Sequence, residues 1–216
     1  MFECDVKLSA DDVPFLLHDD MLSRTTNAPA AFPLDHSLLA GDHPWQTLSQ
    51  LDAGSWHGPT YAGEPPATLA NLARYCRANG YAVNLEIKPT PGTDHHTGVV
   101  VAAHAQSHWR SDTLLPLLTS FSTLALQGAL DTAPELPRGL LLDELWPDWR
   151  IAAQRLGVVA VVCRHTLWTP SLVAQVKLAG WRCLSYTVND AAAVKHLQDL
   201  DTDGVITDRV DHFTPD

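Results

Sequence analysis

The sequence predicts a parallel α/β fold, specifically a TIM-type (β/α)8 barrel. From residue 66 onward, helical stretches alternate with short apolar runs in units of about 20 to 30 residues, a rhythm typical of parallel strands joined by right-handed crossovers. A glycine-rich phosphate loop of the GxGxxG or Walker type is absent, which favours a barrel over a nucleotide-binding doubly wound sheet. The 216 residues, 45% of them hydrophobic, predict one domain over residues 1–216.

Seven segments have the composition of barrel strands. They are residues 2–8, 81–87, 114–120, 139–143, 158–163, 182–188 and 204–207. A closed barrel of this class has eight strands in about 250 residues. The sequence therefore predicts a barrel whose first strand–helix unit is missing.

Helices are predicted between these strands. Their ranges are 66–79, 94–108, 122–130, 149–156, 170–180 and 191–200. Gly80 suits the position after a helix, and Pro170 suits a first turn. Asn189 or Asp190 is the expected cap of the last helix. These signals fix where the helices begin and end.

The N-terminal part has a different pattern. Residues 2–8 alternate strictly, with Phe2, Cys4, Val6 and Leu8 on one face and with Glu3, Asp5 and Lys7 on the other. An extended arm, residues 13–17, follows a turn and leads to His18. Residues 18–64 are rich in Pro, Gly, Asp and His and show little periodicity. They predict a long insertion at the barrel mouth, and a loop of this length is usually functional.

The bulk composition excludes several classes of protein. A net charge of −11 argues against a nucleic-acid partner. No run approaches the roughly 18 apolar residues of a membrane span, and carboxylates interrupt the N-terminus where a signal peptide would be apolar. A cytoplasmic location is therefore expected, although a segment upstream of Met1 is a possible source of a signal. The four widely spaced cysteines are expected to be buried apolar residues rather than disulfides or zinc ligands.

Carboxylates at the strand ends suggest a metal site. Glu3 and Asp5 point the same way, about 6.6 Å apart along the strand, and Glu86 ends the next strand. Three carboxylates in one mouth repel each other unless a cation is bound, and oxygen ligands favour Mg²⁺ or Ca²⁺ over Zn²⁺. Lys88 points into the same mouth and suits a phosphoryl oxygen, whereas His18 suits an acid or base. The plain alternatives are a solvated strand face, a Lys88–Glu86 ion pair and a histidine without function.

Six segments together resemble the glycerophosphodiester phosphodiesterase family. They are FECDVKLS with PFLLHDD and LSRTTN at residues 2–27, LDAGSW at 51–56, NLEIKP at 84–89, SFS at 120–122, YTVN at 186–189 and DGVITDR at 203–209. Their order along nearly the whole chain is much more specific than any one of them. Tyr186 stands where the family usually has tryptophan, which leaves the apolar wall but changes the stacking surface.

The resemblance implies a role for each candidate residue. Glu3, Asp5 and Glu86 are implied ligands of a divalent cation, Mg²⁺ or Ca²⁺. His18 is implied as one of two acid/base histidines, and Lys88 as a phosphate contact. Phe121 and Tyr186 are implied to line the pocket for the alcohol or glycerol. The implied reaction converts a small glycerophosphodiester into sn-glycerol 3-phosphate and an alcohol.

The family pattern begins with an H-R-G strand and an E-N-T segment, which do not occur in residues 1–216. They carry the second histidine and a phosphate-binding arginine, so the resemblance implies impaired activity for this chain. Two alternatives remain open. One is a non-catalytic barrel remnant that serves as a binding or assembly module and self-associates through open barrel edges. The other is a phospholipase or lyase acting on larger lipids, which the missing amphipathic anchor disfavours.

Overall fold

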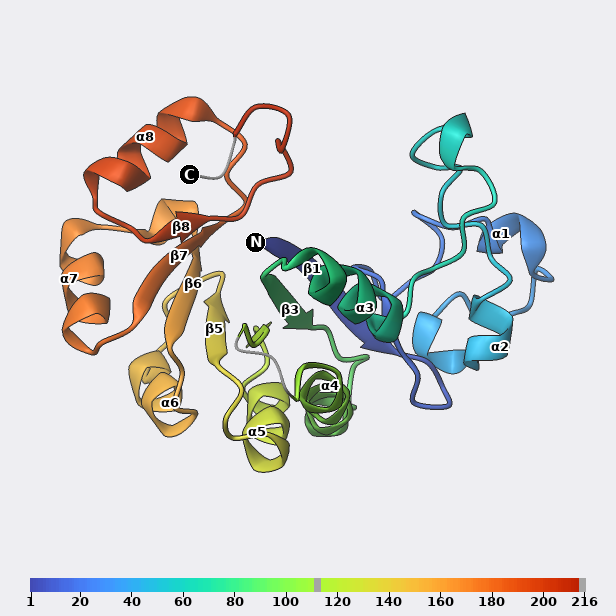
Figure 1. The fold of residues 1–216 in the computed structure, drawn as a ribbon, viewed down its shortest axis with the longest axis horizontal. Coiled ribbons are helices and arrows are strands. Elements are labelled where there is room, and N and C mark those ends of the chain that lie inside the picture. Colours follow the sequence, from blue (N-terminus) through green and yellow to red (C-terminus); the bar gives the residue numbers. More distant parts are fainter. Residues whose placement is uncertain (111–113, 214–216) are drawn as a thin grey trace.

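The computed structural model describes residues 1–110 and 114–213, and its centre is an eight-stranded sheet. The strand order is β2-β1-β3-β4-β5-β6-β7-β8. The strands are β1 (Phe2–Leu8), β2 (Pro14–Leu16), β3 (Val83–Ile87), β4 (Leu117–Ser120), β5 (Arg138–Leu142), β6 (Ala160–Arg164), β7 (Arg182–Tyr186) and β8 (Gly204–Val205). The sheet curls into a half-barrel whose outer side carries helices (Figure 1). This arrangement confirms the predicted parallel α/β class.

The strand pairing differs from the prediction at one place. All neighbours from β1 and β3 through β8 pair in parallel, whereas β2 pairs antiparallel with the end of β1. The extended arm predicted at 13–17 thus contains an eighth strand of the sheet, where the sequence predicted seven. The cause is a tight turn in which Asp12 adopts a φ of 61°. The Ser9 amide donates a hydrogen bond to the Val13 carbonyl oxygen, and the Val13 amide donates one to Ser9 Oγ. Within residues 1–110 and 114–213, β2 and β8 form the two ends of the strand order.

The helices match the predicted ranges closely. They are α3 (Leu69–Asn79), α4 (Asp94–Trp109), α5 (Thr123–Thr132), α6 (Trp149–Arg155), α7 (Pro170–Leu178) and α8 (Ala191–Asp199). Thr68 caps α3 by accepting a hydrogen bond from the Asn71 amide, so this helix begins later than residue 66. Gly80 ends it in the left-handed conformation, as predicted. Asp190, rather than Asn189, caps α8.

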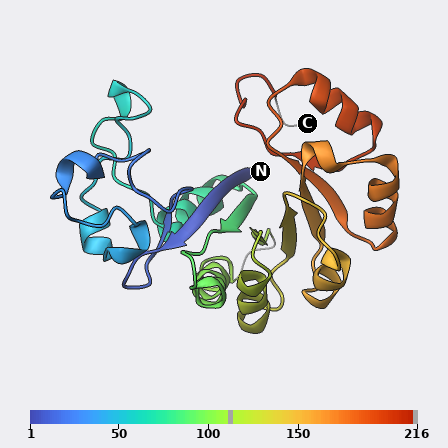
Figure 2. The ribbon, with the colours of Figure 1, turned by 180° about the vertical axis from the view of Figure 1, so that it is seen from behind.

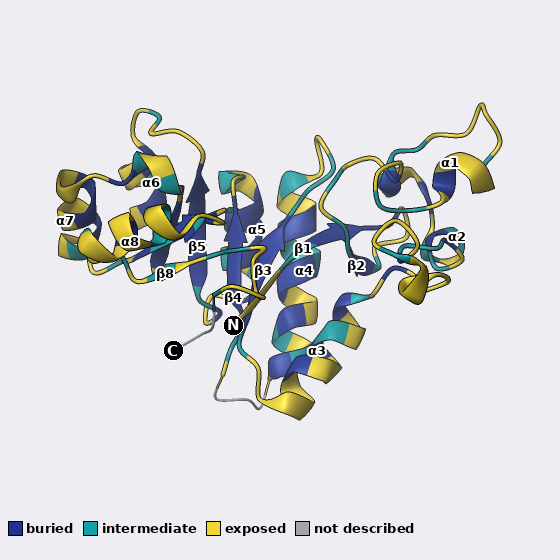
Figure 3. Cartoon of the chain, turned by 90° about the horizontal axis from the view of Figure 1, so that it is seen from above, coloured by how far each residue is buried: buried dark blue, intermediate teal, exposed yellow. Residues whose placement is uncertain are grey.

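Helices α4 and α5 approach each other closely because glycines lie at their contact. A Cβ atom on Gly98 would lie 1.9 Å from the Ala125 carbonyl oxygen, and one on Gly128 would lie 2.2 Å from that of His95. Buried apolar residues form one cluster beneath α3 to α5 and another beneath α6 to α8. β3, β4 and β5 are buried along their whole length, and β6 is buried except at Arg164 (Figure 3). All four cysteines are free, as predicted. Cys76, Cys163 and Cys183 are also buried as predicted, whereas Cys4 is half-buried.

Residues 18–64 contain only short elements. They are α1 (Ala28–Ala31), η1 (Ala40–Asp42), α2 (Trp45–Leu48) and η2 (Pro59–Tyr61). A separate apolar cluster, which includes Phe15, Leu22 and Leu48, holds them against β2. Both views place this segment at the end of the molecule opposite β6 to β8 (Figures 1 and 2). No helix among the described residues is long and apolar enough to cross a membrane.

Candidate functional site

Three carboxylates from two strands converge on one face of the sheet. The parallel register sets Asp5 of β1 opposite Glu86 of β3, and Glu3 lies one side-chain repeat before Asp5. One ligand atom from each of these residues lies within 4.8 Å of the other two. The predicted cluster is therefore present, and we refer to Glu3, Asp5 and Glu86 as the carboxylate cage.

The electrostatics of the cage favour a bound cation. Loss of hydration, followed by repulsion from Asp5 and Glu86, raises the pKa of Glu3 to about 8, although part of the Glu3 residue remains exposed. Loss of hydration also raises the pKa of Glu86, with Lys88 acting in the opposite direction. The buried Oε1 atom of Glu86 has no well-aligned hydrogen bond among the described residues, although the Lys88 ammonium is near it. Oxygen donors that repel each other and lack hydrogen bonds fit Mg²⁺ or Ca²⁺.

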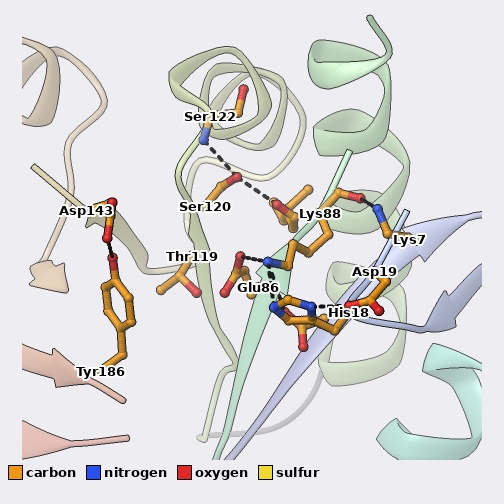
Figure 4. A network of polar contacts seen from close by, with 12 residues as sticks. Lys7, His18, Asp19, Glu86, Lys88, Thr119, Ser120, Ser122, Asp143 and Tyr186 are labelled. Atoms are coloured by element: carbon orange, nitrogen blue, oxygen red, sulfur yellow. Dashed lines mark hydrogen bonds and ion pairs between the residues drawn. The ribbon is translucent and has the colours of Figure 1, made fainter. Parts of the chain in front are cut away.

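Lys88 occupies the centre of the polar network. Its ammonium lies 3.1 Å from Glu86 Oε1, 3.8 Å from Asp5 Oδ1 and 3.3 Å from His18 Nε2. Figure 4 shows Lys88, Glu86 and His18 pointing toward one another from different segments. The ion pair with Glu86 is thus real, and it coexists with an approach to the histidine.

His18 is held in one tautomer by its two neighbours. Its Nδ1 lies 2.7 Å from Asp19 Oδ1, and because a carboxylate only accepts, Nδ1 carries the proton. Nε2 then accepts from the Lys88 ammonium. Arg24 donates to both oxygens of Asp19, at 2.6 and 2.8 Å, and this pairing holds the pKa of Asp19 well below its usual range. The chain Arg24–Asp19–His18 therefore directs an unprotonated nitrogen toward the cage.

Phe121 and Tyr186 form an aromatic corner beside the cage. Their ring centroids are 5.5 Å apart at an interplanar angle of 89°, and the Lys88 ammonium lies 5.9 Å from the Phe121 centroid. The Tyr186 hydroxyl donates to the Leu142 carbonyl at 3.1 Å and lies 3.4 Å from Asp143 Oδ1. Burial, and then the Asp143 charge, raise the pKa of this hydroxyl. Phe121 and Tyr186, predicted from opposite parts of the chain, are thus in contact.

The sequence reasoning missed the role of Lys7. This side chain lies on the predicted face with Glu3 and Asp5, but it is only 1% exposed, so that face is not solvated along its whole length. Its ammonium pairs with Asp20 and lies 3.4 Å from the Lys88 carbonyl oxygen. Asp20 directly follows His18 and Asp19, so the HDD run at residues 18–20 was the sequence signal that could have indicated a partner for Lys7. The pair fixes this run against β1.

Comparison with known proteins gives a consistent result. The family model described as the glycerophosphoryl diester phosphodiesterase family matches residues 1–212. A phosphodiesterase from Oleispira antarctica, solved in complex with the product sn-glycerol-3-phosphate, has a TM-score of 0.85 and 32% identity, with 95% of this chain and 80% of that chain covered. A glycerophosphodiester phosphodiesterase of Caldanaerobacter subterraneus is 27% identical over 95% of this chain and 81% of its own length. The chain belongs to the glycerophosphoryl diester phosphodiesterase family.

Proposed function

We propose that this chain hydrolyses small glycerophosphodiesters to sn-glycerol 3-phosphate and an alcohol with the help of a divalent cation. The observation that carries the proposal is the convergence of the carboxylate cage, Lys88 and the Nε2 of His18 within one network. The product complex of the Oleispira antarctica relative supports the same substrate class.

The cage residues Glu3, Asp5 and Glu86 would hold the cation, Mg²⁺ or Ca²⁺. When bound, such an ion stabilises the charge that develops on a phosphoryl oxygen. Lys88 would bind another phosphoryl oxygen, because its ammonium already lies between the cage and His18. The ion and the ammonium together would offset the negative charge of the three carboxylates.

His18 would move the proton. With Nδ1 bound to Asp19, its Nε2 accepts a proton from the attacking hydroxyl or, once charged, donates one to the leaving alcohol. Phe121 and Tyr186 would form an apolar wall for the carbon skeleton of one ester group. Asp19 and Arg24 position the imidazole through their hydrogen bonds.

We further propose that residues 1–216 form one domain with residues 18–64 as its mouth insertion, and that turnover is slow. Among the described residues, His18 is the one histidine with a contact to Lys88, whereas the resemblance implies two histidines at the site. The edges of β8 and of the first residues of β1 are also suited to self-association. Sedimentation velocity tests this point, and a strictly monomeric chain at all concentrations contradicts it.

The function is tested by ³¹P NMR on the full chain with glycerophosphoglycerol and Mg²⁺ or Ca²⁺. We expect conversion of the diester to the monoester that stops with a chelator. His18→Ala should reduce the rate about 100- to 10,000-fold. His36→Ala is the matched control, because His36 is an exposed histidine outside this network and should leave the rate unchanged. Absence of monoester above the buffer blank with either ion contradicts the proposal.

A further inference from the structure

A cavity of about 460 Å³ opens beside the carboxylate cage, on the side of the 18–64 segment. Its lining combines Glu3, Asp5 and His18 of the site with Arg24, Thr25 and Trp56. Cavities of this size bind small molecules. The cavity is therefore continuous with the catalytic network. Residues of two sequence motifs, RTTN and DAGSW, line it, and apart from Arg24, which holds Asp19, these residues have no role in the reaction as described.

The turn that carries Trp56 is built rigidly. Asp52 Oδ1 accepts hydrogen bonds from the amides of Gly54 and Ser55, both at 2.9 Å. A Cβ atom on Gly54 would lie 1.8 Å from the Tyr61 carbonyl oxygen, so no other residue fits there. The Trp56 indole N–H donates to the Ala53 carbonyl oxygen at 2.8 Å, and yet the residue is 55% exposed. A large aromatic side chain is thus fixed in place while its surface stays open.

The two motifs are joined to each other. The Asn27 amide donates to the Asp52 carbonyl oxygen at 3.0 Å, and the Asp52 amide donates to Asn27 Oδ1 at 2.9 Å. This reciprocal pair fixes the segment with Arg24 and Thr25 relative to the Trp56 turn. The cavity wall is therefore one preorganised unit, which lowers the cost of binding a ligand.

A phosphodiester carries two ester groups, and the sheet order places a separate wall on each side of the cage. Phe121 of the β4 end and Tyr186 of the β7 end lie on one side of β1 and β3, whereas β2 and the 18–64 segment lie on the other. If the phosphate is held at Lys88, one ester group faces the aromatic corner. The other ester group faces the cavity that Trp56 lines.

The lining indicates the class of alcohol. An indole face contacts the C–H face of a polyol, and the Thr25 hydroxyl offers a donor and an acceptor. Arg24 donates through Nε and Nη2 to Asp19, and its Nη1 has no hydrogen-bond partner within residues 1–110 and 114–213. A guanidinium at the wall repels a cationic group such as choline, and its remaining N–H groups bind hydroxyl oxygens.

We propose that this cavity is the subsite for the second ester group and binds an uncharged, hydroxylated alcohol such as glycerol or a cyclitol, with Trp56 as a specificity-determining residue. The inference rests on the proposed function, because the phosphate must be held at Lys88 for the second group to reach the cavity.

The test is an NMR titration of the full chain with Mg²⁺, following the Trp56 indole N–H signal, which Trp56→Phe identifies by its loss. Glycerophosphoglycerol should shift this signal in the wild type. In calorimetric titrations, which do not depend on the indole, Trp56→Ala should weaken binding of glycerophosphoglycerol about tenfold while changing that of sn-glycerol 3-phosphate less than twofold. Thr25→Val should weaken diester binding a few fold. Glycerophosphocholine should bind at least about fivefold more weakly than glycerophosphoglycerol.

Tyr75→Ala is the matched control, because Tyr75 is also 55% exposed but does not line the cavity, and it should bind both ligands like the wild type. Equal effects of Trp56→Ala on diester and monoester, or no effect, overturn the subsite. Tighter binding of glycerophosphocholine overturns the alcohol class. The phosphorus spectrum of the same samples reports hydrolysis separately. If the wild type shows neither binding nor hydrolysis, the proposed function and the subsite are both overturned.

Discussion

The two halves of the sheet bury different chemistry. We call β1, β3 and β4 the cage half and β5 to β8 the far half. The buried polar side chains of the cage-half strands are Lys7, Asn84, Glu86, Thr119 and Ser120. The far-half strands bury two, Arg138 and Ser185, within an otherwise apolar set. Arg138 lies at the first residue of its strand and donates to backbone carbonyls of Leu136 and Leu156 at 2.7 and 3.0 Å.

This difference separates stability from function. The far half is held by apolar packing, in which each substitution has a local cost. The cage half also holds a buried charge in a pair, the Lys7 ammonium with Asp20. Removal of one partner of such a pair costs more than removal of both, because a buried charge is left without compensation. Substitutions in the two halves should therefore change the free energy of unfolding by amounts that differ in sign as well as in size.

The largest effect is expected from Glu86→Gln. Affinity for Mg²⁺ or Ca²⁺ should fall more than about 100-fold, because even residues outside the ligand shell account for 10- to 100-fold. Since burial raises the pKa of Glu86, the ionised carboxylate costs stability without metal, so the variant should melt higher than the wild type in chelator. Calorimetric titration and thermal melts measure both, with Glu144→Gln, an exposed carboxylate, as control. An unchanged metal-induced rise in Tm contradicts the cage.

Asp20→Ala should destabilise the chain by about 3 kcal/mol, because it leaves the buried Lys7 ammonium with the Lys88 carbonyl oxygen as its one remaining hydrogen-bond partner among the described residues. The double variant Lys7→Met/Asp20→Ala should recover most of the loss. Urea unfolding measures both. If the double variant is as unstable as the single one, the pair does not act by compensating a buried charge.

Glu3 of the cage should make stability depend on pH. The pKa of Glu3 is raised from 4.5 to about 8 in the folded chain, so between these values the unfolded chain has lost a proton that the folded chain keeps. Stability without metal should therefore fall as pH rises from about 4.5 to 8 and level off above that. Urea unfolding at several pH values measures the slope, and Glu3→Gln should reduce it. An identical slope in this variant contradicts the assignment.

The smallest effect is expected in the far half, from Tyr186→Phe. The hydroxyl donates to the Leu142 carbonyl oxygen, so its loss should cost about 1 kcal/mol in free energy of unfolding. The ring remains against Phe121, and metal affinity should be unchanged. A large fall in metal affinity would show that the two halves are coupled through the aromatic corner.

Local patterns in the sequence predicted most of the fold and the cage. The alternation over residues 2–8 gave a strand with Glu3 and Asp5 on one side, and the strand ends gave Glu86 and Lys88. The contacts that were missed join segments without a shared pattern. Lys7 with Asp20, and Asn27 with Asp52, form only once the 18–64 segment has its tertiary arrangement, and β2 depends on a turn with a left-handed aspartate. Periodicity reports which face is buried but not which distant side chain meets it there.

The register of β1 has a consequence for how the chain folds. In the far half, each strand pairs with one that follows after a single helix, as Leu184 does with Gly204, so contacts form early and locally. Phe2 pairs instead with Val83, which follows the whole 18–64 segment. Closing this longer loop costs more conformational entropy. The cage is thus assembled by a late, non-local step of folding. On the ribosome, Glu3 and Asp5 would stay apart from the third cage carboxylate until Glu86 emerges.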